Sequence, residues 1–192
     1  MDDTAQPTLR EHAREAVRRQ IALTAIDLFE ARGVDDVTVD DIVTAAGTSA
    51  RTFHRYFTAK EEAVLVDSAA HGRLVTGALG RQAAGDPWSA LRRSLQPLVD
   101  GADAEALRTM RVLLSTQSLR ARSMQKHRDW ADALAPILRG ICLLDETEAR
   151  ALVLSALSCF DAALEEWVGH DGARPLGEIL DRAFRAVGYR HS

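Results

Sequence analysis

Residues 38–60, TVDDIVTAAGTSARTFHRYFTAK, form the stretch that decides the fold of this 192-residue chain. Thr38 and Asp41 have the spacing of a capping box, in which two side chains three residues apart satisfy free backbone N–H groups at the start of a helix. Ile42 and the apolar residues near it give this helix a buried face. Gly47 supplies the left-handed residue that commonly ends a helix. We therefore predict a short helix that closes in a tight turn.

A second short helix follows the glycine turn. The hydroxyl groups of Thr48 and Ser49 are available to cap its start. Its apolar side consists of residues at i, i+3 and i+4 spacing, namely Phe53, Tyr56 and Phe57. The polar residues that lie between them are Arg51, Thr52, His54 and Arg55. Two short helices joined by a glycine turn, the second with exposed basic and hydroxyl side chains, are typical of a helix-turn-helix that binds DNA.

The composition limits how the chain can bind DNA. Its net charge is -4, so the molecule as a whole is not a basic coat for nucleic acid, and binding must depend on a local patch. Between Gly47 and Lys60 the charged residues are Arg51, Arg55 and Lys60, with no carboxylate. The carboxylates of Asp40 and Asp41 fall in the first turn of the preceding helix, where they meet the positive end of its dipole, and we interpret them as structural.

The remaining sequence favours an all-α fold. The hydrophobic content of 46% is that of a globular protein, and runs of β-branched residues are scarce. Capping residues, helical periodicity and glycine breaks together predict nine helices and no strand. Their approximate ranges are 8–32, 38–46, 49–57, 58–79, 86–101, 103–114, 118–138, 145–168 and 175–187. Thr58 with Glu61 and Ser118 are the predicted caps of two of these helices, and Pro97 and Pro136 are expected to break or bend theirs.

The run from Ile21 to Leu65 resembles the N-terminal DNA-binding domain of the TetR family of bacterial repressors. The resemblance is carried by residues 25–29 together with Gly33, and by residues 38–42, 46–49, 52–57 and 60–61. The resemblance implies three helices for DNA binding and six for effector binding and dimerisation. The expected division is a disordered arm at residues 1–8, a helix-turn-helix domain at 9–57 and an effector-binding and dimerisation domain at 58–192. Beyond residue 65 only the number and order of helices are similar.

The resemblance also assigns roles in binding a double-stranded DNA operator. Residues at the starts of the two helices would contact phosphates: Thr38 and either Thr48 or Ser49. The second helix would present four residues to the major groove: Ala50, Arg51, Thr52 and His54. Tyr56 and Lys60 would anchor backbone phosphates, and Phe53 and Phe57 would be core. Many members of the family carry Tyr where this chain has His54, so a base contact by His54 is not implied.

A cationic arginine edge on the first helix leaves two interpretations open. Arg10, Arg14 and Arg18 recur every four residues. They either face phosphates or form a solvated surface on which Glu15 pairs with Arg19. Their position before the helix-turn-helix favours phosphate contacts for Arg10 and Arg14.

Symmetric operators are matched by symmetric dimers, so we expect a homodimer. The helix predicted from Asp145 has one face of large residues and one of small residues, the small ones being Ala151, Ser155, Ser158 and Ala162. The last helix would add Ile179, Ala183 and Val187. Our hypothesis is that both helices pair with their symmetry mates in a four-helix bundle. The alternative is that both faces belong to the core of one subunit.

An effector site is the least defined expectation. The middle helices carry apolar residues that could line a cavity for a bulky apolar or aromatic small molecule, namely Trp88, Leu91, Leu95, Met110, Leu114, Trp130, Leu134 and Phe160. Polar residues that could orient it are Gln117, His127 and Ser158. The alternative for all of the apolar residues is an ordinary filled core, which would suit a helix-turn-helix protein without ligand response.

Other classes of function are disfavoured. The six histidines form no HExxH motif, and no GxSxG motif or glycine-rich phosphate loop occurs, so we expect neither an enzyme nor a bound metal or cofactor. Cys142 and Cys159 have no metal-ligand spacing and are expected to be buried reduced thiols. No segment resembles a signal peptide, and the longest uncharged apolar run, 151–160, is too short to span a bilayer. We therefore expect a cytoplasmic bacterial regulator without membrane contact.

Overall fold

Helices make up the whole regular structure of the computed structural model, which describes residues 8–188 except the side chain of Glu11. These residues form ten α-helices and one 3-10 helix, and no strand occurs among them. The all-α prediction is confirmed. Each of the nine predicted helices is present, and two of them are each divided into two segments. The predicted disordered arm lies outside the described residues, apart from Thr8.

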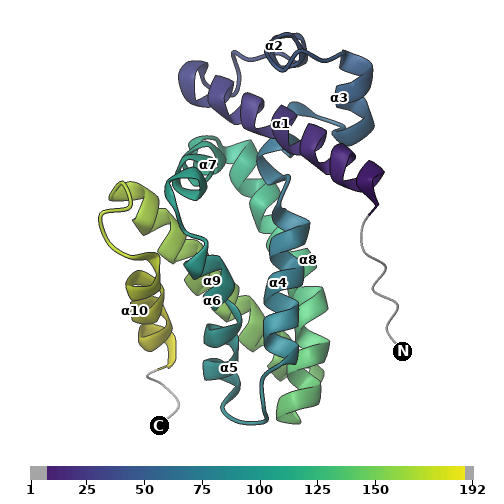
Figure 1. Ribbon diagram of the computed structural model, residues 1–192. Helices are drawn as coiled ribbons and strands as arrows, with labels where there is room; N and C mark the ends of the chain where they lie inside the picture. The colour runs from purple at the N-terminus through teal and green to yellow at the C-terminus, as the bar shows by residue number, and fades with distance from the viewer. Residues whose placement is uncertain (1–7, 189–192) are drawn as a thin grey trace. The chain divides into compact units, whose positions relative to one another are not determined.

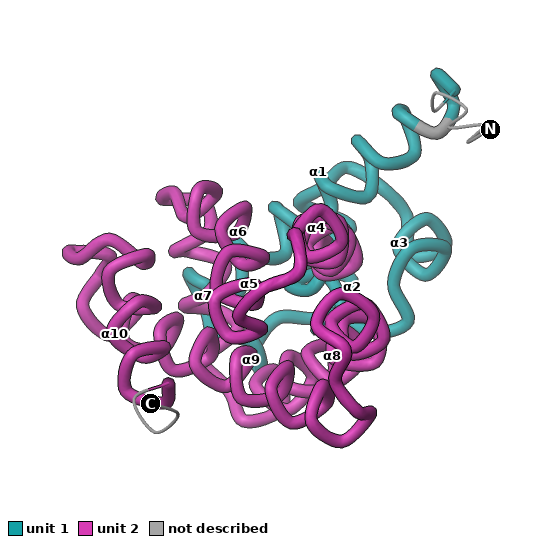
Figure 2. The backbone as a smooth tube through the Cα atoms, turned by 90° about the horizontal axis from the view of Figure 1, so that it is seen from below, with its two compact units in different colours: residues 1–66 teal, residues 67–192 magenta. Residues whose placement is uncertain are grey.

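The chain divides into two compact units at residues 66 and 67 (Figure 2). Unit 1 ends at Val66, and unit 2 begins at Asp67. The helices of unit 1 are α1 (Leu9–Arg32), α2 (Val39–Ala45), α3 (Ala50–Tyr56) and the 3-10 helix η1 (Lys60–Leu65). The division into a DNA-binding domain at 9–57 and an effector domain from residue 58 remains a prediction about function, and η1 is part of the first compact unit.

The core of unit 1 is built by α1 against the three short helices. Residues of α1 at helical spacing are buried, among them Ile21, Ala25 and Phe29. Ile42 from α2 and Phe53 from α3 are fully buried. The guanidinium of Arg18 donates a hydrogen bond of 2.8 Å to the carbonyl of Val66, which ties α1 to the end of the unit. The helix-turn-helix is therefore fastened to a long helix through apolar contacts.

The helix predicted at 58–79 is not continuous. It consists of η1 and of α4 (Ser68–Gly80). Thr58 bonds to Glu62 rather than to the predicted Glu61, with its N–H and its hydroxyl each 2.9 Å from a carboxylate oxygen. A 3-10 helix has 3.0 residues per turn, so the α-helical register does not carry through it. As a result, Val75 is buried, while Leu74 is 50% exposed.

In unit 2, α4 lies beside α8 (Gln117–Cys142) (Figure 1). The helix α9 (Glu146–Gly169) packs against both α8 and α10 (Leu176–Gly188). Three further helices complete it: α5 (Pro87–Ser94), α6 (Gln96–Asp100) and α7 (Ala104–Ser115). One apolar core runs through the unit and includes Leu91, Leu134, Val153, Phe160 and Leu180. A cavity for an effector would have to be opened within, or beside, this core.

The close approach of α4 and α8 depends on a glycine. A Cβ atom at Gly72 would lie 2.7 Å from Nε1 of Trp130, which is closer than real Cβ contacts come. Trp130 is itself 8% exposed and packed within the core. The distance between these two helices is therefore set by the absence of a side chain at position 72.

The helix boundaries in unit 2 follow local capping with one correction. The α8 helix is capped by Thr116, whose hydroxyl accepts from the N–H of Leu119 at 3.2 Å, and not by the predicted Ser118. The predicted break near Pro97 is confirmed, because α5 ends at Ser94 and α6 begins at Gln96. Pro136 lies inside α8, which continues on both sides of it.

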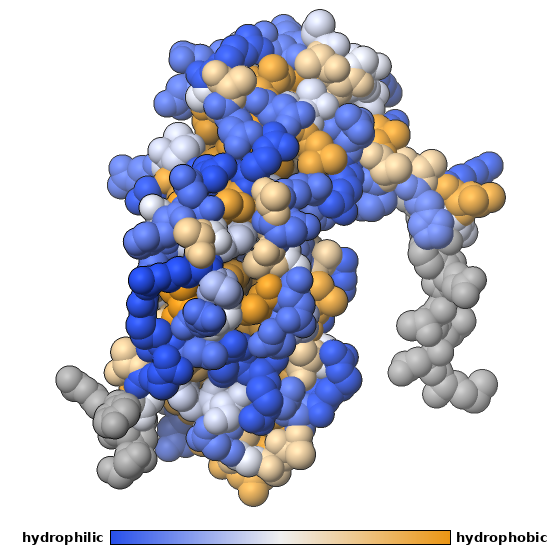
Figure 3. Space-filling view, turned by 60° about the vertical axis from the view of Figure 1, so that its left-hand side comes forward, coloured by the Kyte–Doolittle hydropathy of each residue, from blue (hydrophilic) through white to orange (hydrophobic). Residues whose placement is uncertain are grey.

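The exposed apolar side chains are scattered. On the face drawn in Figure 3, hydrophobic residues form small separate areas among hydrophilic ones. Scattered exposure of this kind is normal for a globular surface. Among the described residues, no helix combines the length and the hydrophobicity that a membrane span requires.

Candidate nucleic-acid interface

The turn between α2 and α3 is fixed by hydrogen bonds that the sequence encodes locally. Thr38 and Asp41 form the predicted capping box, in which the N–H of Thr38 donates to Oδ2 of Asp41 at 2.8 Å. Gly47 has a φ of +62°, and the N–H of Thr48 donates to the carbonyl of Val43 at 2.9 Å. Ser49 then caps α3 by accepting from the N–H of Thr52 at 3.2 Å. These bonds set the direction in which α3 leaves the turn.

The inner side of α3 holds the helix in place. Phe53 is 0% exposed and Phe57 is 2% exposed, and their ring centroids lie 5.3 Å apart. Both are core residues, as the resemblance implied. With these two rings buried, the opposite side of α3 is directed to solvent.

The outer side of α3 is cationic. Arg51, His54 and Arg55 are exposed, and α3 contains no carboxylate. Arg51 has no hydrogen-bond or ion-pair partner among the described residues. An unpaired guanidinium on a short exposed helix is free to pair with the O6 and N7 acceptors of guanine. The half-buried Ala50 and Thr52 flank it.

Arg55 is a candidate that the predicted site did not include. Its guanidinium carbon lies 4.8 Å from the centroid of the Tyr56 ring, and Nη2 donates to the Tyr56 hydroxyl at 3.0 Å. The pair therefore presents a cation and a phenol together. The sequence signal for Arg55 is the local cationic cluster, in which it lies between Arg51 and Lys60.

The polar groups of Thr38 already form hydrogen bonds within the protein. Its hydroxyl lies 2.6 Å from Oδ2 of Asp41, to which it donates, and it accepts from the N–H of Asp41 at 3.1 Å. The hydroxyl and the N–H of Thr38, together with Arg32, hold the pKa of Asp41 below its usual value. A phosphate at this position would have to compete with the Asp41 carboxylate for the same donors.

The ammonium group of Lys60 also forms hydrogen bonds within unit 1. Its ammonium nitrogen lies 2.7 Å from the carbonyl oxygens of Val34 and Val37 and 3.4 Å from that of Asp35. These carbonyls belong to the loop between α1 and α2. Lys60 thus holds that loop against the start of η1. Its two closest bonding partners lie 26 and 23 positions away in the sequence, so no local pattern predicts these contacts.

The arginine edge of α1 is divided between two roles. Arg10 and Arg14 are exposed and have no partner among the described residues. Arg18 pairs with Glu15 at 3.3 Å and also donates to the carbonyl of Val66. Two cations at the start of α1 therefore remain available to an anionic partner.

The predicted dimer residues differ in accessibility. On α9, Ala151, Ser158 and Ala162 are exposed and Ser155 is half-buried, so the small-residue face points outward. The opposite face, with Ala156, Phe160 and Trp167, is buried. On α10, Val187 is 45% exposed and Ala183 is half-buried. Ile179 is only 4% exposed and lies in the core of its own unit, so we leave it out of the interface proposed below.

The predicted effector residues mostly lie inside the packed core. Five of them are buried: Leu91, Leu95, Trp130, Leu134 and Phe160. Trp88, Met110 and Leu114 are half-buried. Gln117 is exposed in the first turn of α8, and the exposed Ser158 donates to the carbonyl of Leu154, so neither points into a buried space. Of the whole set, Trp88 lines an open pocket, which lies between α5 and α10.

His127 is the one predicted polar residue that lies in the interior. Its Nδ1 lies 2.8 Å from Oδ1 of Asp161 on α9, but the two groups are not aligned for a hydrogen bond. The imidazole packs beside Trp130, with 4.9 Å between ring centroids. A buried nitrogen without an aligned partner, next to an aromatic ring, is the most suitable polar group in this core for orienting a ligand.

No group of three or more His, Cys, Asp or Glu side chains is placed to hold a metal ion within residues 8–188. Cys159 is buried, and burial raises the pKa of its thiol, while Cys142 is only half-buried. Both are free thiols.

Two family models match the chain. Residues 21–65 match the model of bacterial regulatory proteins of the tetR family, and residues 86–191 match that of the MftR C-terminal domain. The putative mycofactocin biosynthesis transcriptional regulator MftR of Mycobacterium tuberculosis is 31% identical over 185 residues, which cover 91% of each chain.

Solved structures share the fold at lower identity. The fatty acid degradation regulator FadR from Bacillus halodurans has a TM-score of 0.63 at 21% identity, with 92% of this chain and 97% of that chain covered. Thermus thermophilus FadR, solved in complex with lauroyl-CoA, has a TM-score of 0.59 at 23% identity, with 91% and 95% covered.

The matches agree with the geometry described above. The first family model ends at Leu65 in η1, and the second spans α5 to α10. The helix-turn-helix therefore belongs to a DNA-binding domain, and the relatives are regulators rather than enzymes. This chain belongs to the TetR family of transcriptional regulators, with a C-terminal domain of the MftR type.

Proposed function

We propose that the protein is a homodimeric repressor in the bacterial cytoplasm that binds a palindromic operator and is released from it by a small, largely apolar effector. The observation that supports this most is the outer side of α3, where exposed cations meet no carboxylate while Phe53 and Phe57 anchor the helix from within. Such a helix is suited to the major groove, where base edges carry the sequence.

The proposed DNA contacts separate into base and phosphate contacts. Arg51 is the main base contact, with Ala50, Thr52 and His54 beside it. Phosphates are contacted by Thr48, Ser49 and Tyr56, and also by Arg55, which lies against the Tyr56 ring. We assign Thr38 and Lys60 to supporting the interface, because their donors already bond to Asp41 and to the loop after α1.

The proposed dimer forms through the outward face of α9. Small side chains such as Ala151, Ser158 and Ala162 allow two helices to approach closely, and the exposed Leu154 adds apolar area. Ala183 and Val187 of α10 are the further contacts. Replacing Ser158 by Arg should give a monomeric mass in light scattering and much weaker operator binding. Retention of a dimer by this variant would place the interface elsewhere.

The proposed effector enters between α5, α8 and α9, which contribute Leu91, Leu134 and Phe160 to the apolar core and where His127 offers a polar group. A fold relative was solved with lauroyl-CoA, a ligand with a long apolar chain, which supports this class of compound. Effector and operator would favour different conformations, and each would then weaken the other by the same factor.

A second candidate is a DNA-binding protein without ligand response. It is favoured by the burial of five of the eight apolar residues expected to line the cavity. A thermal-shift series with lauroyl-CoA, free laurate and coenzyme A separates the two candidates. Stabilisation by lauroyl-CoA or laurate, but not by coenzyme A, supports the sensor. The absence of a shift with any of several compound classes supports the fixed repressor.

Selection of bound duplexes from a random DNA pool tests the main proposal. We expect a palindromic site with half-sites one helical turn or more apart, which matches a symmetric dimer. Recovery of no preferred sequence at low salt would overturn it.

A further inference from the structure

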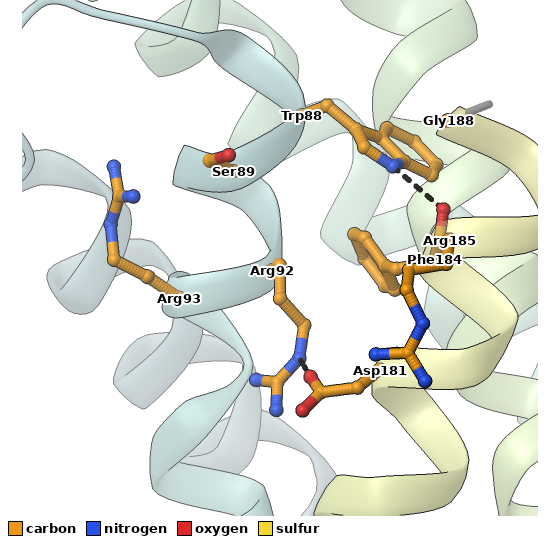
Figure 4. Close-up of a pocket in the computed structure, with 8 residues that line it drawn as sticks. All are labelled: Trp88, Ser89, Arg92, Arg93, Asp181, Phe184, Arg185 and Gly188. Atoms are coloured by element: carbon orange, nitrogen blue, oxygen red, sulfur yellow. Dashed lines mark hydrogen bonds and ion pairs between the residues drawn. The ribbon is translucent and has the colours of Figure 1, made fainter. Parts of the chain in front are cut away.

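We propose that the pocket between α5 and α10 binds an aromatic monocarboxylate at a site distinct from the effector site proposed between α5, α8 and α9. The pocket has a volume of about 540 Å³, within the range of small-molecule sites. Its lining comes from Trp88, Ser89, Arg92 and Arg93 of α5 and Asp181, Phe184, Arg185 and Gly188 of α10 (Figure 4).

The aromatic wall of this pocket is rigid. The rings of Trp88 and Phe184 pack at 4.6 Å between centroids, and the indole N–H donates to the carbonyl of Phe184 at 3.1 Å. A Cβ at Gly188 would lie 2.8 Å from the indole nitrogen, so the backbone also holds the ring. Because its N–H is already used, the indole offers a ligand its apolar ring surface rather than a hydrogen bond. This favours a planar, apolar ligand group.

The charged wall carries an excess of one positive charge. Arg92 pairs with Asp181 through Nε at 2.6 Å, and its Nη1 donates to Gln96. Arg185 is exposed and has no hydrogen-bond or ion-pair partner among the described residues. Figure 4 shows the guanidinium groups of Arg92 and Arg185 on the same side of the pocket as the Asp181 carboxylate, whereas Arg93 points away.

These charges define the ligand class. Two guanidinium groups and one carboxylate give this wall a net charge of +1. A bound monoanion neutralises that charge, whereas a bound dianion would leave a net charge of -1. A guanidinium binds a carboxylate through two parallel hydrogen bonds, so Arg185 is the expected primary contact. With the ring on Trp88 and the carboxylate on Arg185, the pocket suits an aromatic monocarboxylate.

Calorimetry with the 192-residue chain tests this site with 1-naphthoate as the probe. We expect one saturable site per chain for 1-naphthoate and weaker binding of the neutral 1-naphthamide and of the dianionic 1-naphthyl phosphate. Arg185→Gln should weaken 1-naphthoate binding roughly tenfold or more, the value of a charge-assisted hydrogen bond. Arg139→Gln, a change at another exposed arginine, should leave it unchanged.

The outcomes test whether the ligand's charge and Arg185 determine binding. Binding of 1-naphthamide as tight as that of 1-naphthoate, or unchanged 1-naphthoate binding to Arg185→Gln, would overturn the proposal. Because Arg185 is exposed and has no partner among the described residues, its substitution should not alter the thermal unfolding of the free protein, and that measurement accompanies each titration. Loss of operator binding is not expected in this variant, so the proposed repressor function is tested independently.

Discussion

The helix α3 and the core of unit 2 contrast in how they support recognition. In α3, Arg51 and His54 are exposed while Phe53 is completely buried, and the turn and caps that set the direction of the helix come from residues close to it in sequence. In unit 2, the residues expected to meet an effector, such as Leu134 and Phe160, are buried among residues from distant parts of the chain. A DNA-binding surface is thus encoded locally, whereas a ligand cavity depends on how separate helices pack.

The largest expected effect comes from removing the anchor of α3. Phe53→Ala should cost about 3–5 kcal/mol, the range for deleting a buried phenylalanine ring, and should abolish operator binding through loss of unit 1. The neighbouring exposed His54→Ala should leave the stability within about 0.5 kcal/mol. Chemical denaturation of both variants measures this difference, and equal stability would show that α3 is not held by its inner side.

The contrast also explains what the sequence could and could not predict. The capping box at Thr38, the left-handed Gly47 and the Ser49 cap are local features, and all of them occur in the structure. The outward small-residue face of α9 followed from periodicity in the same way. These features depend on residues within four positions of each other.

Features that depend on distant contacts were not predictable. The bonds of Lys60 to Val34 and Val37 and the burial of Ile179 arise from how elements pack. The helix predicted at 58–79 is interrupted by a 3-10 segment from Lys60, so Val75 rather than Leu74 is buried in α4. Helical periodicity shows which residues share the apolar face of a helix, but not which other element packs against that face.

A smaller effect is expected in unit 2 at the contact of α4 with α8. Gly72→Ala places a methyl group against Trp130 and should destabilise this unit by about 1–3 kcal/mol, the usual cost of overpacking. Gly80→Ala in the same helix meets nothing within 4 Å and serves as the matched control. Hydrogen exchange should show the loss of protection in unit 2 and not in unit 1. Equal protection in both variants would mean that the helices separate easily, as an effector would require.

Lys60→Ala distinguishes structural support from phosphate contact. If the ammonium holds the loop after α1, this variant should lose about 1–2 kcal/mol of stability in the absence of DNA. If it contacts phosphate instead, stability should be unchanged and affinity for all DNA sequences should fall equally. Thermal unfolding of the free protein decides between these outcomes, with Arg55→Ala as the control for a surface cation.

The smallest expected effect is a dependence on acid pH. Hydrogen bonds from Thr38 hold the pKa of Asp41 below its usual 3.8, so the carboxylate stabilises the folded state above that pH. This stabilisation is lost as the pH falls through the lowered pKa, because only then is the folded carboxylate protonated. The difference in melting temperature between the wild type and Asp41→Asn should therefore be smaller at pH 2 than at pH 7. A difference that does not change with pH would contradict the role of this carboxylate, and Asp40→Asn is the control.

The most direct test of the account is the ratio of affinities for the selected operator and for unrelated DNA, measured for the wild type and Arg51→Ala at one salt concentration. We predict that the substitution lowers this ratio roughly ten- to a hundredfold, as expected for the loss of one bidentate base contact, while affinity for unrelated DNA changes far less. An unchanged ratio, with both affinities reduced equally, would show that α3 contacts only the phosphate backbone at this position and would contradict the account.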